Sequence, residues 1–136
     1  MVTYLGGNFR EQTDAVISQA NPTSGTQYTV LEVHGCGRLR FGQASVTWTG
    51  QPDPLELHVT VDTKTVTFTK ATPVSATDYW TTIHMYSANA GSLDGTAENA
   101  GRQSYLYDFV GYCKVLAETT GGTTQNLSAR VVYAVK

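Results

Sequence analysis

Alternating apolar and polar residues run through most of the chain and predict a protein built from β-strands. The stretch VTVDTKTVTF, residues 59–68, is a clear example. A period of two residues is typical of a strand that buries one face and leaves the other face free. We therefore expect an antiparallel hairpin over 54–70. Its inward side chains are Val59, Val61, Val66 and Phe68, and its outward threonines are Thr60, Thr65 and Thr67.

Similar runs, separated by turn residues, predict seven or eight strands between residues 27 and 136. They cover 27–34, 38–48, 54–61, 64–70, 78–87, 103–119 and 125–135, and the run 103–119 is either one strand or two strands broken at Gly111. The hairpin turn at Asp62 and Thr63 lacks the glycine that such turns usually contain, so we expect a longer or different turn. This arrangement predicts an all-β fold, an antiparallel β-sandwich of jelly-roll or Greek-key type.

Two details of the alternation are specific enough to test. In 27–34 we expect Leu31 and Val33 to face the core, with Val30, Glu32 and His34 outside. In 38–48 the apolar residues change from odd to even positions near Gly42, which predicts a β-bulge there.

The chain divides into an irregular N-terminal arm, 1–26, and a sandwich domain, 27–136. Within the arm, Thr13 to Ser18 has the pattern of a single helical turn with Thr13 as its cap. The arm either lies on the sandwich or reaches a neighbouring subunit. The Gly-rich segment 88–101 is expected to be the longest surface loop.

Composition supports an all-β domain and excludes several classes of protein. The 136 residues include 21 Thr and 8 Tyr, which favour strands, and only 15% are charged. The net charge of −2, without any basic run, argues against nucleic-acid binding. No apolar stretch is long enough to span a membrane, and no signal-peptide pattern is present. We therefore expect that the protein is made inside a cell, or that a signal has been removed from the chain, and we expect no membrane or nucleic-acid partner.

The two cysteines, Cys36 and Cys113, are too far apart in sequence for a CxxC motif. They are either two free buried thiols or a disulfide that joins two strands.

Residues that carry chemistry are scattered rather than arranged in a known motif. The histidines at 34, 58 and 84 lie opposite the core residues of their strands, but a zinc site would require them to converge, and no acidic partner is evident. Glu32 and Glu56 face outward on strands that could be neighbours. A glycosidase needs two carboxyls flanking a cleft, and a small sandwich with short loops leaves little room for one. The aspartates at 14, 53, 94 and 108 lack calcium-loop spacing. We expect no cofactor, no bound metal and no enzymatic activity.

Aromatic residues are the stronger signal. Trp80, His84 and Tyr86 share one face of their strand, and Trp48 lies near the end of another strand. An exposed stripe of this kind stacks on sugars or anchors a protein interface, whereas a strand covered on both faces would bury it as ordinary core. These three interpretations stay open.

The segment 21–68 resembles the small β-sandwich domains of tailed-phage virion proteins, such as head-decoration and tail-fibre modules. The similarity lies in PTS followed by YTVL, in Gly35, Gly37 and Leu39, and in the run LHVTVDTKT that begins at Leu57. It covers about a third of the chain, and Thr63 stands where such domains usually have Gly. The resemblance implies a non-enzymatic virion protein, usually a trimer or a protein docked on another trimer.

With the resemblance added, we expect a capsid decoration protein that stabilises a lattice by burying interfaces with the major capsid or tail protein. It would form a homo-oligomer, with a trimer favoured, be made in the host cytoplasm without a signal peptide, and reside in the virion. The candidate interface residues are Trp48, Trp80, His84, Tyr86, Thr60, Thr65 and Thr67. The alternative is a tail-fibre or carbohydrate-binding module that uses its exposed aromatics to bind a surface glycan.

Overall fold

The computed structural model describes residues 13–48, 54–70, 80–86, 94–98, 107–120 and 124–136, and these residues form ten strands and no helix. The strands are β1 (Thr13–Ala20), β2 (Tyr28–His34), β3 (Gly37–Trp48), β4 (Leu55–Val61), β5 (Lys64–Lys70), β6 (Trp80–Tyr86), β7 (Asp94–Glu98), β8 (Tyr107–Phe109), β9 (Tyr112–Thr119) and β10 (Thr124–Val135). None of the described residues belongs to a helix with the length and apolarity needed to cross a membrane.

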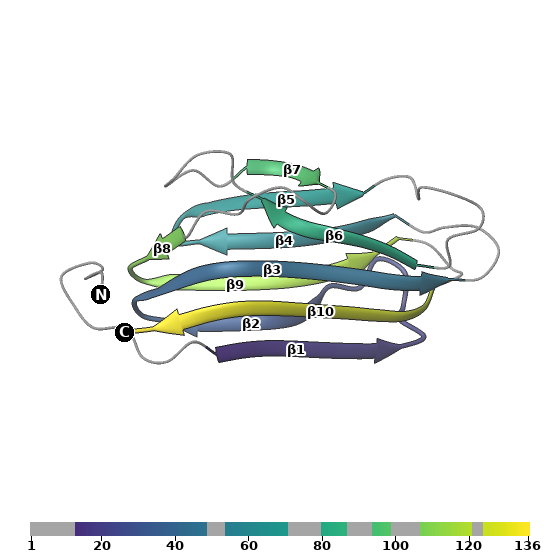
Figure 1. Ribbon diagram of the computed structural model, residues 1–136, viewed down its shortest axis with the longest axis horizontal. Coiled ribbons are helices and arrows are strands. Elements are labelled where there is room, and N and C mark those ends of the chain that lie inside the picture. The colour runs from purple at the N-terminus through teal and green to yellow at the C-terminus, as the bar shows by residue number, and fades with distance from the viewer. Residues whose placement is uncertain (1–12, 49–53, 71–79, 87–93, 99–106, 121–123) are drawn as a thin grey trace.

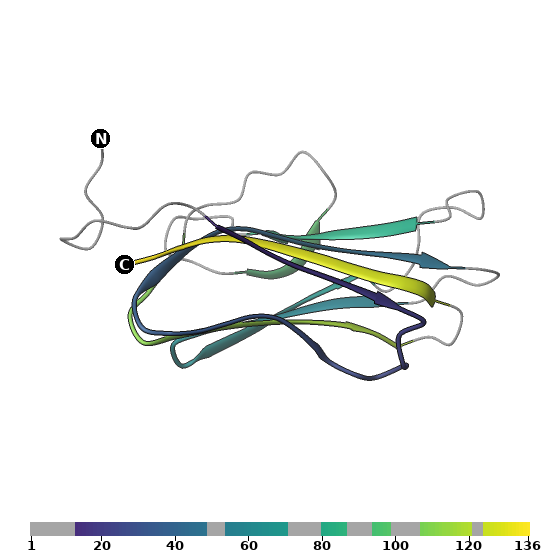
Figure 2. The same cartoon turned by 90° about the horizontal axis from the view of Figure 1, so that it is seen from below.

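The strands form two layers packed face to face, as predicted for a β-sandwich (Figure 2). The first layer has the order β1-β10-β3-β6, with the short β8 also paired to β3, and the second has the order β2-β9-β4-β5. Neighbours within each layer are antiparallel. β7 joins the layers along one side, because it pairs antiparallel with β6 and makes one parallel bridge to β5.

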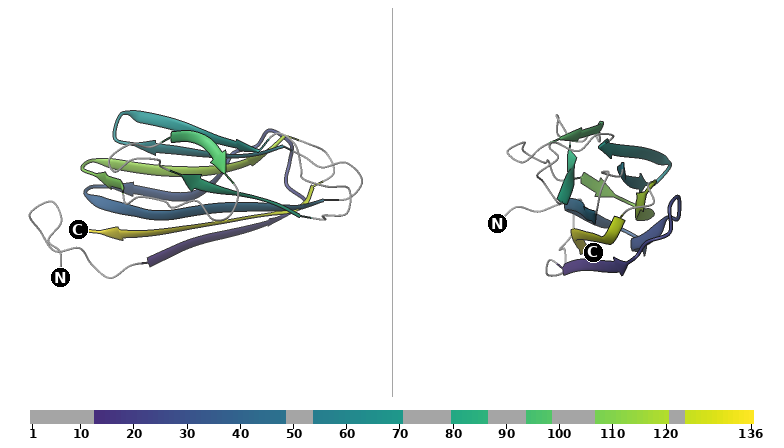
Figure 3. Two further views of the ribbon diagram at one scale, coloured as in Figure 1. Left: turned by 45° about the horizontal axis from the view of Figure 1, so that its top comes forward. Right: turned by 90° about the vertical axis from the view of Figure 1, so that its right-hand side faces the viewer.

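On the opposite side of the sandwich no described strand joins the two layers, because the order of paired strands begins at β1 and ends at β2. Figures 1 and 3 show these two edge strands on the same side of the molecule. Within the described residues β1 pairs only with β10, and β2 pairs only with β9. Each of the two strands therefore has one edge without a strand partner among these residues.

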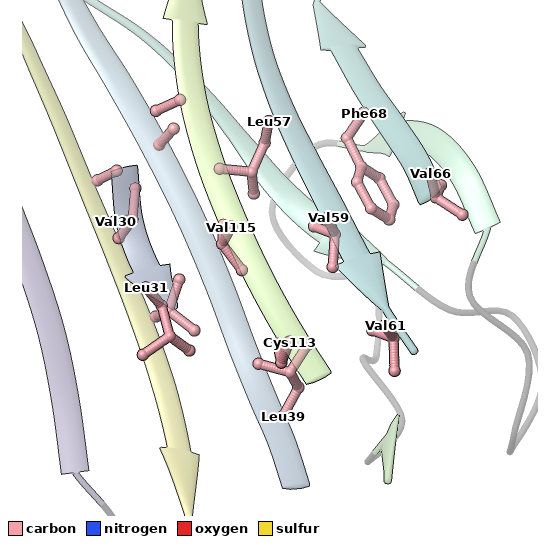
Figure 4. Packing of buried hydrophobic residues seen from close by; sticks show 14 of the residues in the cluster. Val30, Leu31, Leu39, Leu57, Val59, Val61, Val66, Phe68, Cys113 and Val115 are labelled. Atoms are coloured by element: carbon pink, nitrogen blue, oxygen red, sulfur yellow. The ribbon is translucent and has the colours of Figure 1, made fainter. Parts of the chain in front are cut away.

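The core lies between the layers and consists of the inward side chains that the alternation predicts (Figure 4). From the hairpin, Val59, Val61, Val66 and Phe68 are all buried. Facing residues such as Leu39, Val46 and Val131 come from the first layer, and Cys113 and Val115 come from β9. Burial of these branched and aromatic side chains is the main term that stabilises the fold.

Residues 13–20 form a strand of the first layer, so the predicted helical turn is wrong. The segment pairs along its whole length with β10, from Thr13 opposite Tyr133 to Ala20 opposite Asn126. Ala15 and Ile17 alternate inward and pack against the core, whereas Val16 faces out. Tertiary pairing with a long neighbouring strand outweighs a short local capping signal. The segment 88–101, expected to be a loop, likewise contains β7.

The predicted bulge near Gly42 is confirmed, whereas the predicted orientation of the side chains in 27–34 is partly wrong. The pairing of β3 with β10 shifts between Phe41 and Leu39, so Arg40 is the extra residue of a bulge close to Gly42. A second shift in the pairing of β2 with β9 leaves Val30 as the extra residue. Val30 is consequently buried beside Leu31, although simple alternation places it outside.

The turn between β4 and β5 explains the absence of glycine. Val61 pairs with Lys64, which leaves Asp62 and Thr63 as a two-residue loop. The positive φ falls on Asp62, at 54°, and not on Thr63. Aspartate tolerates this left-handed conformation far better than a β-branched residue does.

Candidate functional site

The outer face of the second layer carries most of the polar side chains that the sequence singles out. On β4 the residues between the buried leucines and valines are Glu56, His58 and Thr60, and all three are half-buried. Across the hairpin, Thr60 faces Thr65, and His58 faces Thr67. The period of two therefore places these groups together on one surface.

The threonine hydroxyls on this face bind one another and a histidine. The oxygens Oγ1 of Thr60 and Thr65 lie 2.9 Å apart, which is a hydrogen bond across the strands. Oγ1 of Thr67 lies 3.1 Å from Nδ1 of His58. Each of these hydroxyls thus already has a partner within the sheet. Their role in an interface stays a prediction.

Two carboxylates meet one imidazole in the middle of this face. Glu56 on β4 is directly opposite Glu118 on β9. Nε2 of His58 lies 3.1 Å from Oε2 of Glu56 and 3.3 Å from Oε2 of Glu118. The side chains of Glu56, His58 and Glu118 are only 26%, 17% and 12% exposed. We call these three residues the Glu-His-Glu cluster.

The Glu-His-Glu cluster places two carboxylates directly opposite each other on neighbouring strands. Like charges placed directly opposite each other on neighbouring strands destabilise a sheet, and partial burial weakens the screening by water. Within the described part of the chain, the only ion-pair partner of Glu56 or Glu118 is His58. The three side chains offer one nitrogen and two oxygens whose positions lie within 4.8 Å of one another.

The other pairings considered from the sequence do not form. Glu32 on β2 is opposite Lys114 on β9, not near Glu56. Lys114 Nζ lies 3.2 Å from Glu32 Oε2. The hydrogen bond from this ammonium group lowers the pKa of Glu32. His34 is exposed at the end of β2, where its ring lies 5.0 Å from that of Tyr112, so it does not converge with His58.

The carboxylate of Asp62 binds backbone N–H groups of a neighbouring turn. It accepts hydrogen bonds from the backbone N–H groups of Val110, Gly111 and Tyr112, at 2.8 to 3.2 Å. These bonds, led by that of Gly111, lower the pKa of Asp62. The group joins the β4–β5 turn to the β8–β9 turn, and its role is structural.

Both cysteines are free thiols, so the disulfide alternative does not hold. Cys36 is partly exposed, contrary to the expectation that both thiols are buried, and its Sγ donates a hydrogen bond to the carbonyl of Val110. Cys113 is completely buried in the core. Burial, with a smaller effect of the Asp62 charge, raises the pKa of Cys113 to about 12.

The aromatic candidates are outside the part of the molecule whose side chains are described. The backbones of Trp80, His84 and Tyr86 lie in β6, and that of Trp48 ends β3. The structure describes the backbone of these four residues but not their side chains. Their role in an interface or in glycan stacking stays a prediction.

The edge strand β1 is a surface that the sequence interpretation missed. Val16 on its outward face is 65% exposed. The strand is eight residues long and contains neither Lys nor Pro, the residues that commonly protect an edge. Its one charged residue, Asp14, is engaged by Arg130 of β10, with Nη2 2.7 Å from Oδ2.

The member of the Glu-His-Glu cluster that sequence reasoning missed is Glu118. Its outward position follows from the alternation of Cys113, Val115 and Ala117, which are all buried. Knowing that β9 lies beside β4 is the additional information that places Glu118 opposite Glu56. Sequence spacing does not supply that pairing, because the two residues are far apart in the chain.

Comparisons with protein-family models, with curated proteins and with solved structures give no match for this chain.

Proposed function

We propose that this protein is a non-enzymatic structural component of a virus particle, a decoration protein that binds a capsid lattice by burying protein surface. The observation that carries the proposal is the outer edge of β1, which pairs with no other strand among the described residues. This strand offers a row of backbone N–H and C=O groups, next to the exposed side chain of Val16. An extended segment of a neighbouring protein can add to such an edge as a further strand.

The chemistry of β1 fits an edge that is covered in an assembly. Long edge strands without protective residues are prone to unwanted pairing, and soluble proteins usually protect them. Here the inward residues Ala15 and Ile17 fix the strand on the sandwich, while Val16 stays outside. A partner strand would satisfy the backbone groups and bury this valine.

Binding to a repeating lattice is possible even if the β1 edge buries only a modest area. A stable interface between two proteins buries about 1,200–2,000 Å² in total. One edge strand supplies only part of that area, but repeated subunits raise the effective concentration of each contact. The low content of charged residues, 15%, is consistent with surfaces that pack against neighbours. The resemblance to phage β-sandwich modules supports the same assignment.

The experiment is co-sedimentation with particles from a virus whose gene for this protein has been deleted. Purified protein is added, and the bound fraction is measured with two matched variants. Val16→Asp places a charge on the edge strand, and Val110→Asp places one at an equally exposed valine, 64% against 65%, in the β8–β9 turn. We expect wild type and Val110→Asp to bind, and Val16→Asp to lose at least tenfold in affinity. Wild-type protein that stays in the supernatant contradicts the proposal.

A further inference from the structure

We propose that the Glu-His-Glu cluster is a binding site for a divalent transition-metal ion of the zinc type, with Nε2 of His58 and one oxygen each of Glu56 and Glu118 as ligands. The site does not depend on the proposed function, because it lies on the outer face of the second layer, on β4 and β9, and not on the β1 edge.

The distances from His58 to the two carboxylates fit a tetrahedral ion. Zinc binds histidine nitrogen and carboxylate oxygen at about 2.0–2.2 Å, so two ligands of a tetrahedral site are about 3.3 Å apart. The observed separations from Nε2 of His58 are 3.1 Å and 3.3 Å to the carboxylate oxygens. The third separation, between the two carboxylates, is within 4.8 Å. The two separations from His58 therefore already match a tetrahedral site, and the glutamate side chains need only bring their oxygens from within 4.8 Å to about 3.3 Å of each other.

The histidine is held in the orientation that a metal ligand needs. Metal-binding histidines usually donate the hydrogen of their other ring nitrogen to an oxygen, which fixes the tautomer. Thr67 on β5 supplies such an oxygen, with Oγ1 3.1 Å from Nδ1 of His58. When Nδ1 donates its hydrogen to Thr67, the lone pair of Nε2 points toward the two carboxylates. Nε2 of His58 and the two carboxylates are then three hydrogen-bond acceptors without a hydrogen between them. A cation bound to all three would remove this unfavourable arrangement.

The negative charges of Glu56 and Glu118 favour a cation between these two side chains and His58. Glu56 and Glu118 are opposite each other on adjacent strands, and Glu118 is nine-tenths buried as a residue. His58 is their only ion-pair partner among the described residues. A divalent cation would neutralise both carboxylates. The imidazole ligand selects zinc and its neighbours over calcium and magnesium, which prefer oxygen ligands alone.

Three protein ligands leave one position of a tetrahedral site for water or for a group from another molecule. The cluster lies at the surface of the sheet and is partly exposed, so that position is reachable from solvent. The competing explanation is a proton on His58, which would let the imidazole bridge the two carboxylates without a metal. The two explanations differ in whether the protein binds an added ion.

The test is a zinc titration of the full chain after dialysis against a chelator. We expect wild type to bind one Zn²⁺ per chain, with no comparable binding of Mg²⁺ or Ca²⁺. His58→Gln should lose this binding, and Glu118→Gln should weaken it at least tenfold. Thr67→Val removes only the group that orients His58, so about a 10–100-fold loss of affinity is expected, as is usual for such partners.

The matched control is His34→Gln combined with Cys36→Ser. His34 also lies beside a carboxylate, 3.4 Å from Glu32, but its side chain is 76% exposed and has no second carboxylate as an ion-pair partner in the described part of the chain. This control should bind zinc as tightly as wild type. Loss of binding in the control, or unchanged binding in His58→Gln, would overturn the proposal.

A crystal of zinc-loaded wild type gives a readout that does not depend on the folding of any variant. Anomalous scattering at the zinc edge should place one ion between His58, Glu56 and Glu118. An ion bound elsewhere, or wild-type protein that binds no zinc, would overturn the proposal.

Discussion

The carboxylate of Asp62 accepts a hydrogen bond from the backbone N–H of Gly111 at 2.8 Å and so joins two turns that are 49 residues apart in sequence. The same carboxylate also accepts from the N–H groups of Val110 and Tyr112, each at 3.2 Å. One side chain therefore satisfies the donors of the β8–β9 turn while its own backbone forms the β4–β5 turn. These hydrogen bonds connect the two turns at this end of the sandwich.

Replacing Asp62 by Asn should lower the free energy of unfolding by about 1 kcal/mol. Asparagine tolerates the positive φ of 54° and keeps one acceptor oxygen, so the change removes the charge rather than the turn. Hydrogen bonds to charged groups contribute more than neutral ones, but solvent reduces the difference at a half-exposed site. Urea unfolding at pH 7 measures the loss, and an Asn variant as stable as wild type would show that the charge contributes nothing.

The stabilisation by Asp62 should disappear in acid. The pKa of Asp62 is lowered in the folded protein, so the folded state holds its proton less tightly than the unfolded chain does. Its contribution is fully present above the ordinary aspartate pKa of about 3.9 and is lost as the pH falls through the folded value. The difference in stability between wild type and Asp62→Asn should therefore shrink below about pH 4. A difference that stays constant from pH 7 to pH 3 would contradict this assignment.

The two cysteines should differ strongly in their reactivity toward thiol reagents. Cys113 is buried and its pKa is about 12, so almost none of it is thiolate at pH 8. Cys36 is partly exposed. We expect a disulfide-exchange reagent to label one thiol per chain in the native protein and two in denaturant. Mass spectrometry should identify the native label at Cys36, and equal labelling of both sites would show that Cys113 is accessible.

Gly37→Ala should destabilise the protein, whereas Gly111→Ala should not. A Cβ at Gly37 would overlap the ring of Phe109 and lie 2.6 Å from the backbone oxygen of Ala134, which cannot move without disturbing β10. A Cβ at Gly111 would meet only the carboxylate of Asp62 at 3.6 Å, an ordinary contact. We expect a loss of about 1–3 kcal/mol for the first, as in an overpacked core, and less than about 0.5 kcal/mol for the second. Similar melting temperatures for both variants would mean that the approach of Phe109 to Gly37 is not close.

Phe68→Ala should be among the most damaging changes in the core. Phe68 is completely buried, whereas the next residue, Thr69, points outward and is exposed. Truncating a buried phenylalanine costs about 3–5 kcal/mol, because it combines lost burial with a cavity. Thr69→Ala on the same strand should change stability by less than about 0.5 kcal/mol. Denaturant midpoints for the pair measure the difference, and equal values would contradict the assignment of Phe68 to the core.

The sequence predicts the fold well where a strand buries one face and is flanked by turn residues. The hairpin of β4 and β5 is the best case, since Val59 and Phe68 are buried and Thr60 and Thr65 are outside, as the alternation requires. The sequence does not predict the conformation or burial of a residue where these depend on which strand lies beside it. Residues 13–20 are extended because β10 lies beside them, and Val30 is buried because a bulge rotates it inward.

The candidate metal site is harder to predict than the fold. His58 and Glu56 are separated by one residue on β4, so their common face follows from the sequence alone. Glu118 joins them only because β9 pairs with β4 in a particular register, in which Glu56 is opposite Glu118. A slip of one residue would place Glu118 in the core and Ala117 outside. Register is set by the complete core, and short motifs do not encode it.

The proposed function makes the protein a fixed structural component of a virus particle. The most direct measurement is the number of its copies relative to the major capsid protein in particles purified on a density gradient, determined by quantitative mass spectrometry. We predict a constant ratio across the particle peak, which persists after repeated banding. A protein that remains at the top of the gradient, or whose ratio falls toward zero with each round, would contradict the assignment.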